Sequence, residues 1–136
     1  MIGVTLDSNI YISGLEFGGI GLRLLNMGRA GIIRIDVSAA IIDEVIRVLR
    51  DDFRWEGYRL HFAREKLAKI GNVVVPRQSL QVIDEDPDDD RILECAVEAR
   101  SEYIVTFDKD LLRQREYAAI PIITPADFLQ RGIELA

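Results

Sequence analysis

The sequence predicts an α/β fold, a three-layer α/β/α sandwich with a central parallel sheet. Short apolar and β-branched runs alternate with longer amphipathic segments along the 136 residues, as is typical of parallel strands joined by right-handed helical crossovers. The run at residues 2–6 has no polar interruption except a threonine, which favours a strand buried on both faces. Because no repeat, low-complexity segment or linker divides the sequence, residues 1–136 are expected to form a single domain.

Strands are expected at five places along the chain. They lie at residues 2–6, 32–37, 73–75, 103–107 and 120–123. Pro76 has no backbone N–H to donate, so it is expected to end the third strand. In a parallel sheet the carboxyl ends of the strands share one edge, and open α/β sheets bind their ligands there.

Helices are expected between the strands, where residues with known start and stop preferences bound amphipathic segments. They lie at residues 18–28 (with Gly31 as an alternative end), 39–50, 55–70, 88–100 and 108–117, and from residue 125 onward. Ser38 and Thr124 are natural N-caps for two of these helices, and Pro125 suits a first helical position. Gly71 followed by Asn72 is a typical helix end.

Composition and charge limit the classes of protein to consider. Hydrophobic residues make up 49% and charged residues 29%, which is typical of a globular protein rather than a disordered one. The net charge of −6 is not that of a nucleic-acid-binding surface, although a bound metal would change the local field. The single cysteine, Cys95, excludes an internal disulfide and a cysteine-based zinc site and fits the reducing cytoplasm. No membrane association is expected, because no apolar stretch approaches ~20 residues and no signal peptide opens the chain.

Acidic residues stand near the ends of several expected elements. Asp7 follows the first strand, Asp108 follows the fourth, and Glu44 lies at the margin of the apolar stripe of helix 39–50. Residues 84–90 hold six acids in seven positions. Most of these acids also suit a purely structural role. Asp108 suits an N-cap, Glu44 suits a surface position, and the acids of the run at 84–90 suit the N-terminus of the helix that follows.

Helix phase separates the acids of the run at 84–90. Residues 92, 93, 96 and 99 form the apolar stripe of the following helix, and Asp89 falls in its middle, whereas Asp88 and Asp90 fall at its margins. An inward-facing carboxylate is costly unless it is paired or bound to a metal. Asp89 is therefore expected to be the functional acid, with Asp86 and Asp90 as its nearest competitors.

These acids predict a metal site. Clustered oxygen ligands without histidine or cysteine suit a hard cation, Mg²⁺ or Mn²⁺, and such a site performs metal-assisted hydrolysis of a phosphodiester. The candidate catalytic and metal-binding residues are Asp7, Glu44, Asp89 and Asp108. Thr106 lies on the same side of its strand as Asp108 and is expected to hydrogen-bond into the site.

The same residues carry a family resemblance. Asp7-Ser8-Asn9 resembles the Asp-Thr-Asn opening of PIN-domain nucleases, and Glu44, Asp89 and Thr106-Phe107-Asp108 are similar to the remaining acidic positions of that family. Phe107 departs from the pattern, since the family often has a small or polar residue there. Small proteins of this type resemble the ribonuclease toxins of type II toxin–antitoxin systems (VapC-like). The resemblance implies Mg²⁺- or Mn²⁺-dependent cleavage of single-stranded RNA, a homodimer, and inhibition by a small antitoxin protein.

Two alternative functions come from other classes. A PIN-like module could bind RNA or protein without cutting, but the complete set of acids favours an enzyme. A phosphotransfer protein fits less well, because residues 120–123 offer no lysine and Asn9 stands where an aspartyl phosphatase needs an acid. His61 is expected to pack among aromatic residues rather than to catalyse, so no Ser/His/Asp triad is expected.

Basic and aromatic side chains remain lesser candidates. Lys109, Arg113 and Arg115 lie near Asp108 and suit either the binding of flanking phosphates or a solvated helix face. Trp55, Tyr58 and Phe62 follow helical spacing, which favours packing or a dimer face over base stacking.

Overall fold

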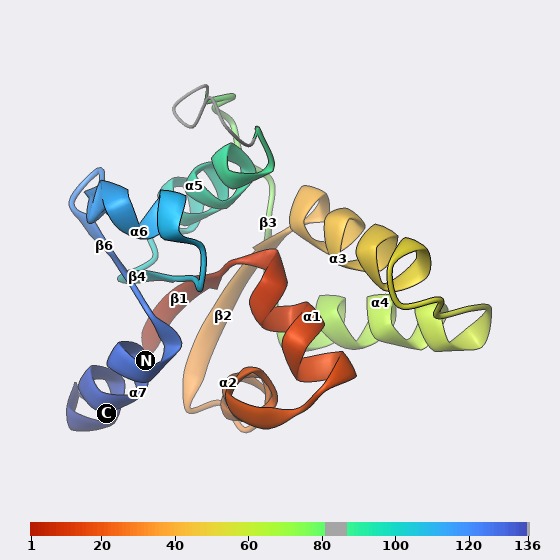
Figure 1. Ribbon diagram of the computed structural model, residues 1–136. Coiled ribbons are helices and arrows are strands. Elements are labelled where there is room, and N and C mark those ends of the chain that lie inside the picture. The colour runs from red at the N-terminus through yellow and green to blue at the C-terminus, as the bar shows by residue number, and fades with distance from the viewer. Residues whose placement is uncertain (81–86, 136) are drawn as a thin grey trace.

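The computed structural model describes residues 1–80 and 87–135 of the chain (Figure 1). Within these residues the strands are β1 (Ile2–Leu6), β2 (Ile33–Ser38), β3 (Asn72–Val74), β4 (Tyr103–Val105), β5 (Glu116–Tyr117) and β6 (Ile120–Ile123). The helices are α1 (Ser8–Glu16), α2 (Gly19–Arg29), α3 (Ala39–Asp51), α4 (Tyr58–Ile70), α5 (Pro87–Ala99), α6 (Lys109–Gln114) and α7 (Pro125–Leu135).

The strands form one sheet in the order β3-β2-β1-β4-β6-β5. Neighbouring strands are parallel from β3 to β6, and β5 pairs with β6 in the antiparallel direction. The chain runs outward from β1 through β2 to β3 and then returns to β4 on the other side of β1. The order therefore reverses between β1 and β4, and ligands of open α/β sheets bind outside the carboxyl ends of strands at such a switch point.

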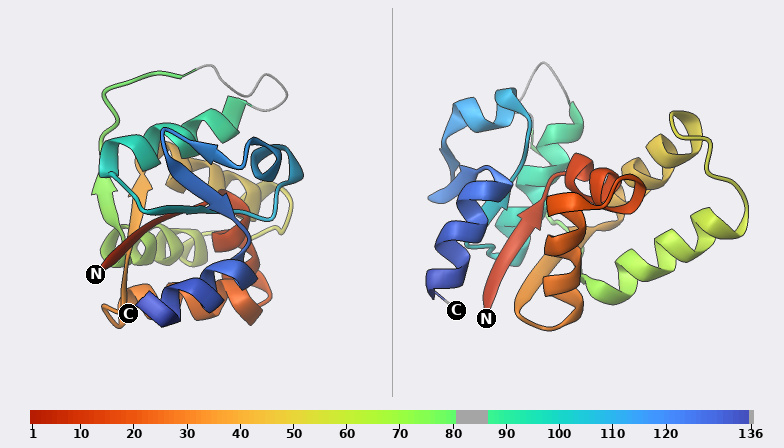
Figure 2. Two further views of the ribbon diagram at one scale, coloured as in Figure 1. Left: turned by 90° about the vertical axis from the view of Figure 1, so that its left-hand side faces the viewer. Right: turned by 60° about the horizontal axis from the view of Figure 1, so that its bottom comes forward.

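Helices cover both faces of the sheet, which confirms the predicted three-layer α/β/α fold with a mostly parallel centre (Figures 1 and 2). In strand β2, alternate side chains face the helices on opposite sides of the sheet. Ile35 and Val37 face the side of α2 and α4, since a Cβ added to Gly28 or Gly71 would meet them at 2.3 and 2.5 Å. Arg34 and Asp36 alternate with them and face α5, where Ser101, just beyond the end of that helix, donates to the Asp36 carboxylate.

Helices α1 and α2 cross at a pair of glycines. A Cβ added to Gly14 would lie 2.7 Å from the carbonyl carbon of Gly21, and one added to Gly21 would lie 2.6 Å from the carbonyl oxygen of Ile10. The two backbones are thus in direct contact, which only residues without a side chain permit. This contact fixes α1, the helix that directly follows Asp7, against the body of the protein.

Three elements, α1, α6 and β5, differ most from the sequence-based expectation. Helix α1 is absent from the expected helices, because β-branched residues and Gly14 weaken its propensity, and its packing against α2 and α3 stabilises it instead. The helix expected at 108–117 ends at Gln114. Arg115 has a φ of 66°, and Ala118 and Ala119, at 51° and 65°, form the two-residue turn of the β5–β6 hairpin. That turn carries no Asn-Gly or Gly-Gly signal, so β5 could not be predicted from the residues around it.

The expected helix caps are confirmed. The Ser38 hydroxyl accepts a hydrogen bond from the backbone N–H of Ile41 at 3.3 Å, and the Thr124 hydroxyl accepts one from Asp127 at 3.2 Å. Ser38 is the last residue of β2 and the cap of α3. The cap therefore starts α3, the helix that carries Glu44, at the carboxyl edge of the sheet.

Candidate metal centre

Three acids converge at the carboxyl edge between β1 and β4. Asp7 follows β1, Asp108 lies just beyond β4, and Asp89 lies in the first turn of α5. One carboxylate oxygen from each lies within 4.8 Å of the others. The backbone N–H of Asp7 donates to the carbonyl of Val105 at 2.9 Å, so strand pairing itself brings Asp7 beside the segment that carries Asp108.

Thr106 connects two of these acids. Its hydroxyl donates to Oδ2 of Asp7 at 2.6 Å and accepts from the backbone N–H of Asp108 at 2.9 Å. This confirms the expectation that Thr106 hydrogen-bonds into the site. Because Thr106 is fully buried, its hydroxyl sets the orientation of the Asp7 carboxylate and of the chain at Asp108 together.

The electrostatic environment of Asp7 disfavours a negative charge. Burial is the main cause that raises the pKa of Asp7, and the nearby negative charge of Asp108 raises it further. Hydrogen bonds from Thr106 and from the backbone N–H groups of Ser8 and Asn9 act in the opposite direction. The net result is a raised pKa, so the ionised form of Asp7 lacks full compensation from the protein itself.

Asp108 combines two roles that were weighed as alternatives. Its Oδ1 accepts a hydrogen bond from the backbone N–H of Asp110 at 2.9 Å, which makes it the N-cap of α6. It also belongs to the three-acid cluster. The capping hydrogen bond fixes the direction of the Asp108 side chain, and Asp108 still contributes a carboxylate oxygen to the cluster.

Asp89 and Asp90 are both buried, whereas Asp90 was expected at the margin of its helix. Burial at the margin of a helix depends on the chain that packs beside it. The backbone N–H of Leu80 donates to Glu94 at 2.7 Å, and Arg91 donates to the carbonyl of Leu80 at 3.0 Å. Residue 80 therefore contacts the side of α5 that carries Glu94. Asp89 belongs to the three-acid cluster and Asp90 does not; Asp86, the other competitor, lies outside the described residues.

Glu44 lies beside this cluster rather than within it. Its Oε2 accepts a hydrogen bond from the hydroxyl of Ser8, the residue after Asp7, at 2.5 Å. Arg47 lies between Glu44 and Asp88, at 3.9 and 3.6 Å from their carboxylate oxygens. Burial, followed by the negative charges of Asp88 and Asp7, raises the pKa of Glu44 to about 7. Glu44 thus contacts the site through Ser8 and interacts with it electrostatically.

The donor set fits a hard divalent cation. The cluster offers carboxylate oxygens from Asp7, Asp89 and Asp108, the ligand type that Mg²⁺ and Mn²⁺ prefer. The raised pKa values of Asp7 and Glu44 reflect negative charge held in a poorly solvated place. A dication bound among these oxygens would offset that charge and lower both pKa values.

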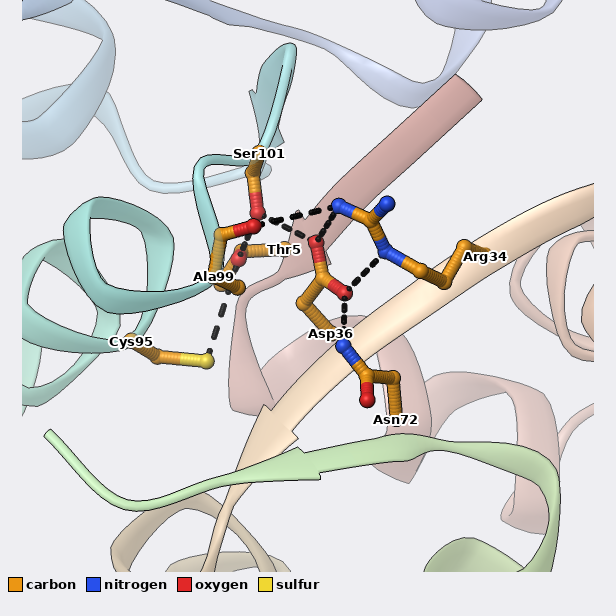
Figure 3. Close-up of polar contacts among 7 residues, drawn as sticks. All are labelled: Thr5, Arg34, Asp36, Asn72, Cys95, Ala99 and Ser101. Carbon is orange, nitrogen blue, oxygen red and sulfur yellow. Dashed lines mark hydrogen bonds and ion pairs between the residues drawn. The ribbon is translucent and has the colours of Figure 1, made fainter. Parts of the chain in front are cut away.

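Sequence reasoning missed a buried carboxylate outside the three-acid cluster, that of Asp36, which faces α5 (Figure 3). The Asp36 carboxylate accepts hydrogen bonds from Arg34 at 2.7 and 3.1 Å, from Asn72 at 2.9 Å and from Ser101 at 2.6 Å. Arg34 also donates to the carbonyl of Ala99 at 3.2 Å, at the end of α5. Asp36 is therefore paired within the protein and joins β2, β3 and the carboxyl end of α5. The available signal was an acid alternating with apolar residues inside a buried strand.

The expected contact of His61 with aromatic residues is confirmed in part, because its ring lies 5.8 Å from that of Phe62 between centroids, but the side chain is not buried. His61 is exposed on α4 and pairs with Glu65 at 3.1 Å. Tyr58 and Phe62 stack on each other at 6.2 Å between ring centroids and are also exposed, whereas Trp55 is buried. This exposed face of α4 is separate from the three-acid cluster.

Parallel strands with three carboxylates at their switch point define an α/β protein with a candidate divalent-metal site. The chain belongs to the PIN domain family, which matches residues 3–110 and thus spans β1 to the start of α6, with all the acids discussed above. PIN domains are generally metal-dependent nucleases. No curated protein matches the chain.

Across the part of the chain that the structure describes, every helix is too short or too polar to cross a membrane.

Proposed function

We propose that this chain is a Mg²⁺- or Mn²⁺-dependent endoribonuclease that hydrolyses phosphodiester bonds in single-stranded RNA. The observation that carries the proposal is the cluster of Asp7, Asp89 and Asp108 within 4.8 Å at the β1–β4 edge. In this proposal the three aspartates hold the metal ion, and Glu44 acts beside them as the fourth catalytic acid. Membership of the PIN domain family supports the same reaction class.

Each residue has a distinct part in the proposed reaction. Asp7, Asp89 and Asp108 would hold the ion, which when bound would supply positive charge to a phosphoryl oxygen and lower the pKa of a water molecule that acts as the nucleophile. Thr106 keeps the Asp7 carboxylate in a fixed orientation through its 2.6 Å hydrogen bond. The pKa of Glu44 is about 7 without metal, and a bound dication would lower it, so Glu44 would be ionised near neutral pH and able to accept the proton of the attacking water. Ser8 holds Glu44 in place through the bond to Oε2.

RNA cleavage with and without metal tests this proposal. Wild-type protein is expected to cut single-stranded RNA in Mn²⁺ or Mg²⁺ and not in EDTA. Asp7→Asn and Asp89→Asn are expected to abolish the cleavage while leaving the fold intact by circular dichroism. Asp43→Asn is the matched control, because Asp43 is exposed on α3 and pairs with Arg64, so it should retain wild-type activity. Cleavage by Asp7→Asn or Asp89→Asn at the wild-type rate would show that the altered residue is not in the site.

The same assay tests the non-catalytic alternative. A PIN-like module that only binds RNA or protein would bind without cutting in any metal. Three carboxylates that lie within 4.8 Å of one another repel each other unless a cation offsets their charge, which favours the enzyme. Binding by the wild type without cleavage in Mn²⁺ or Mg²⁺ would favour the module instead.

We further propose that the nuclease is the toxin of a toxin–antitoxin pair. In this proposal residues 1–136 act as a single domain in the cytoplasm, as a homodimer that a small antitoxin protein inhibits. The proposal rests on the sequence resemblance and on the acid cluster. Induced expression in a bacterial host is expected to arrest growth, and Asp89→Asn is expected to relieve the arrest. Growth that is unaffected by active enzyme would contradict the toxin assignment without affecting the nuclease assignment, and light scattering would test the dimer.

A further inference from the structure

We propose that an aromatic groove beside the metal centre binds the base of an unpaired nucleotide next to the scissile phosphate. This inference rests on the proposed nuclease function, because it assigns part of the RNA substrate to a surface outside the acid cluster. It assigns a role to Phe17, Phe53 and Phe107, none of which has a part in the metal centre.

The groove lies between α1, α3 and the loop that follows β4. Its volume is about 480 Å³. Its apolar lining comes from three separate segments of the chain. They contribute Ile12 and Phe17 from α1 and its end, Val48 and Phe53 from α3 and the turn that follows it, and Phe107 from the loop after β4. The groove is therefore a product of the tertiary fold rather than of one helix.

Two residues that line the groove are sequence neighbours of acids in the cluster. Asn9, which lines it, lies two residues after Asp7, and Phe107, which also lines it, directly precedes Asp108. Each phosphate of a nucleic acid is joined to its neighbouring base through a single sugar. A phosphate held at the acids therefore brings an adjacent base to the mouth of the groove.

The groove presents aromatic faces to solvent. The side chain of Phe17 is 73% exposed and that of Phe107 is 45% exposed. Phe17 and Phe53 make an edge-to-face contact, with ring centroids 5.7 Å apart and an angle of 80°, which holds both rings in defined orientations. Rings of this kind are suited to stacking on nucleobases, an interaction that tolerates different sequences because every base has a π-face.

Charge favours a nucleic acid over an apolar peptide as the occupant. Lys109 directly follows Asp108 and is exposed, and Arg47 lies 3.6 Å from the carboxylate of Asp88, the residue before Asp89. Both cations are therefore close to acids of the cluster, where they suit the binding of backbone phosphates. Only an unpaired nucleotide can insert its base into the groove, because a base in a duplex is already stacked on both faces. The groove thus selects single-stranded substrate.

Equilibrium binding of a fluorescent ten-nucleotide single-stranded RNA, measured in Ca²⁺ by anisotropy, tests the subsite. Phe107→Ala is expected to weaken binding about 5- to 140-fold, which is a stacking energy of about 1–3 kcal/mol converted at 1.4 kcal/mol per tenfold. Phe107→Tyr is expected to bind as the wild type does. Val75→Ala is the control, because Val75 is 82% exposed and does not line the groove, so it should leave binding unchanged. Thermal melting checks that each variant is folded.

A series of RNAs that each lack one base completes the test. Wild-type protein should bind the RNA that lacks the stacked base as weakly as Phe107→Ala binds the intact RNA. With that RNA, Phe107→Ala should bind with the same affinity as the wild type. Equal weakening of every RNA by Phe107→Ala, or no weakening, would overturn the subsite. Preferential binding of a duplex, or loss of self-association in Phe107→Ala without a change in RNA binding, would also overturn it. Failure of the nuclease proposal is distinguishable, since it appears as absent cleavage in Mn²⁺ while base-dependent binding persists.

Discussion

Thr106 orients two acids of the candidate metal centre, although its own oxygen is not one of the clustered carboxylate atoms. Its hydroxyl contacts Asp7 and the backbone of Asp108, at 2.6 and 2.9 Å. Groups that orient metal ligands in this way matter almost as much as the ligands, because a rotated carboxylate no longer points at the ion. The orientation of Asp7 therefore depends on a side chain ninety-nine residues away in the sequence.

Thr106→Val tests this dependence with little change in shape. The variant is expected to lower Mn²⁺ affinity about 10- to 100-fold, since the Asp7 carboxylate loses the donor that fixes it. Isothermal titration with Mn²⁺ measures the loss, and Thr106→Ser, which keeps the hydroxyl, should retain most of the affinity. Wild-type affinity in Thr106→Val would mean that Asp7 is oriented by other groups.

Glu44 predicts a pH dependence of stability in metal-free buffer. Its pKa is about 4.5 in the unfolded chain and about 7 in the folded protein, so the folded state binds the proton more tightly. Proton binding by Glu44 therefore contributes to the free energy of unfolding. This contribution is fully present below pH 4.5 and is lost as the pH rises towards 7. Because the side chain is only half-buried, we expect a loss on the order of 1–2 kcal/mol between these limits.

Urea denaturation in EDTA, from about pH 4.5 to about pH 8, measures this effect across the titration of Glu44. The raised pKa of Asp7 acts in the same direction, so a smaller decline is expected to remain in Glu44→Gln. Asp43→Asn, on the exposed side of the same helix, is the control and should show the wild-type decline. A flat profile for the wild type would contradict a raised pKa at Glu44.

The sequence predicted the convergence of acids better than it predicted their surroundings. Asp7 and Asp108 follow from their place at strand ends, and Asp89 follows from the phase of its helix. The burial of Asp90 could not be predicted, because helix phase places Asp90 at the margin of the apolar stripe, where tertiary packing decides whether a side chain is buried. The position of Glu44 beside the cluster depends on α1, which places Ser8 within hydrogen-bonding distance.

At the scale of the element, the crossing of α1 and α2 depends on Gly14 and Gly21. Alanine has the higher helix propensity by about 1 kcal/mol, so propensity alone predicts that Gly21→Ala stabilises α2. The crossing predicts the opposite, because the added Cβ would lie 2.6 Å from the carbonyl oxygen of Ile10. The tertiary contact dominates, since backbone atoms of a packed helix cannot move aside as a side chain can.

Gly21→Ala is therefore expected to lower the free energy of unfolding by about 1–3 kcal/mol. Urea denaturation measures the change, and Asn26→Ala on the exposed side of the same helix is the control, with an expected change within about 0.5 kcal/mol. A more stable Gly21→Ala protein would show that α1 and α2 can separate without cost.

The elements that the sequence failed to predict share a physical cause. Helix α1 has weak local propensity and is stabilised by its contacts with α2 and α3. Strand β5 depends on two alanines with positive φ, a conformation that alanine rarely adopts without tertiary support. Elements with strong local signals, such as α3 with its Ser38 cap, agree with the prediction to within a residue or so.

At the scale of the whole molecule, strand order determines whether the acids meet. The sequence predicted most of the strands singly but not their order, and only an order that makes β1 and β4 neighbours brings Asp7 beside Asp108. In that order β1 lies at the switch point, with β2 and β3 on one side of it and β4, β6 and β5 on the other.

Because the three clustered carboxylates repel one another, binding of a metal ion among them is expected to raise the free energy of unfolding. Saturation with Mn²⁺ at about 100 times its dissociation constant should stabilise the wild type by about 2.7 kcal/mol, seen as a higher Tm. Asp89→Asn is expected to melt at a higher temperature than the wild type in EDTA, because repulsion among the three acids is relieved, and to lose the Mn²⁺ response. A wild-type Tm that Mn²⁺ does not change would contradict a metal site at the cluster.

The two edges of the sheet limit how copies of the protein can associate. The edge strands are β3, with three residues, and β5, with two. Strands this short expose few unpaired backbone N–H and C=O groups, and natural proteins use short edges to prevent sheets from joining. A continuous sheet across two protomers would therefore gain little. The proposed homodimer is expected to form through helical surfaces, and the exposed Tyr58 and Phe62 of α4 are the first positions at which to test it.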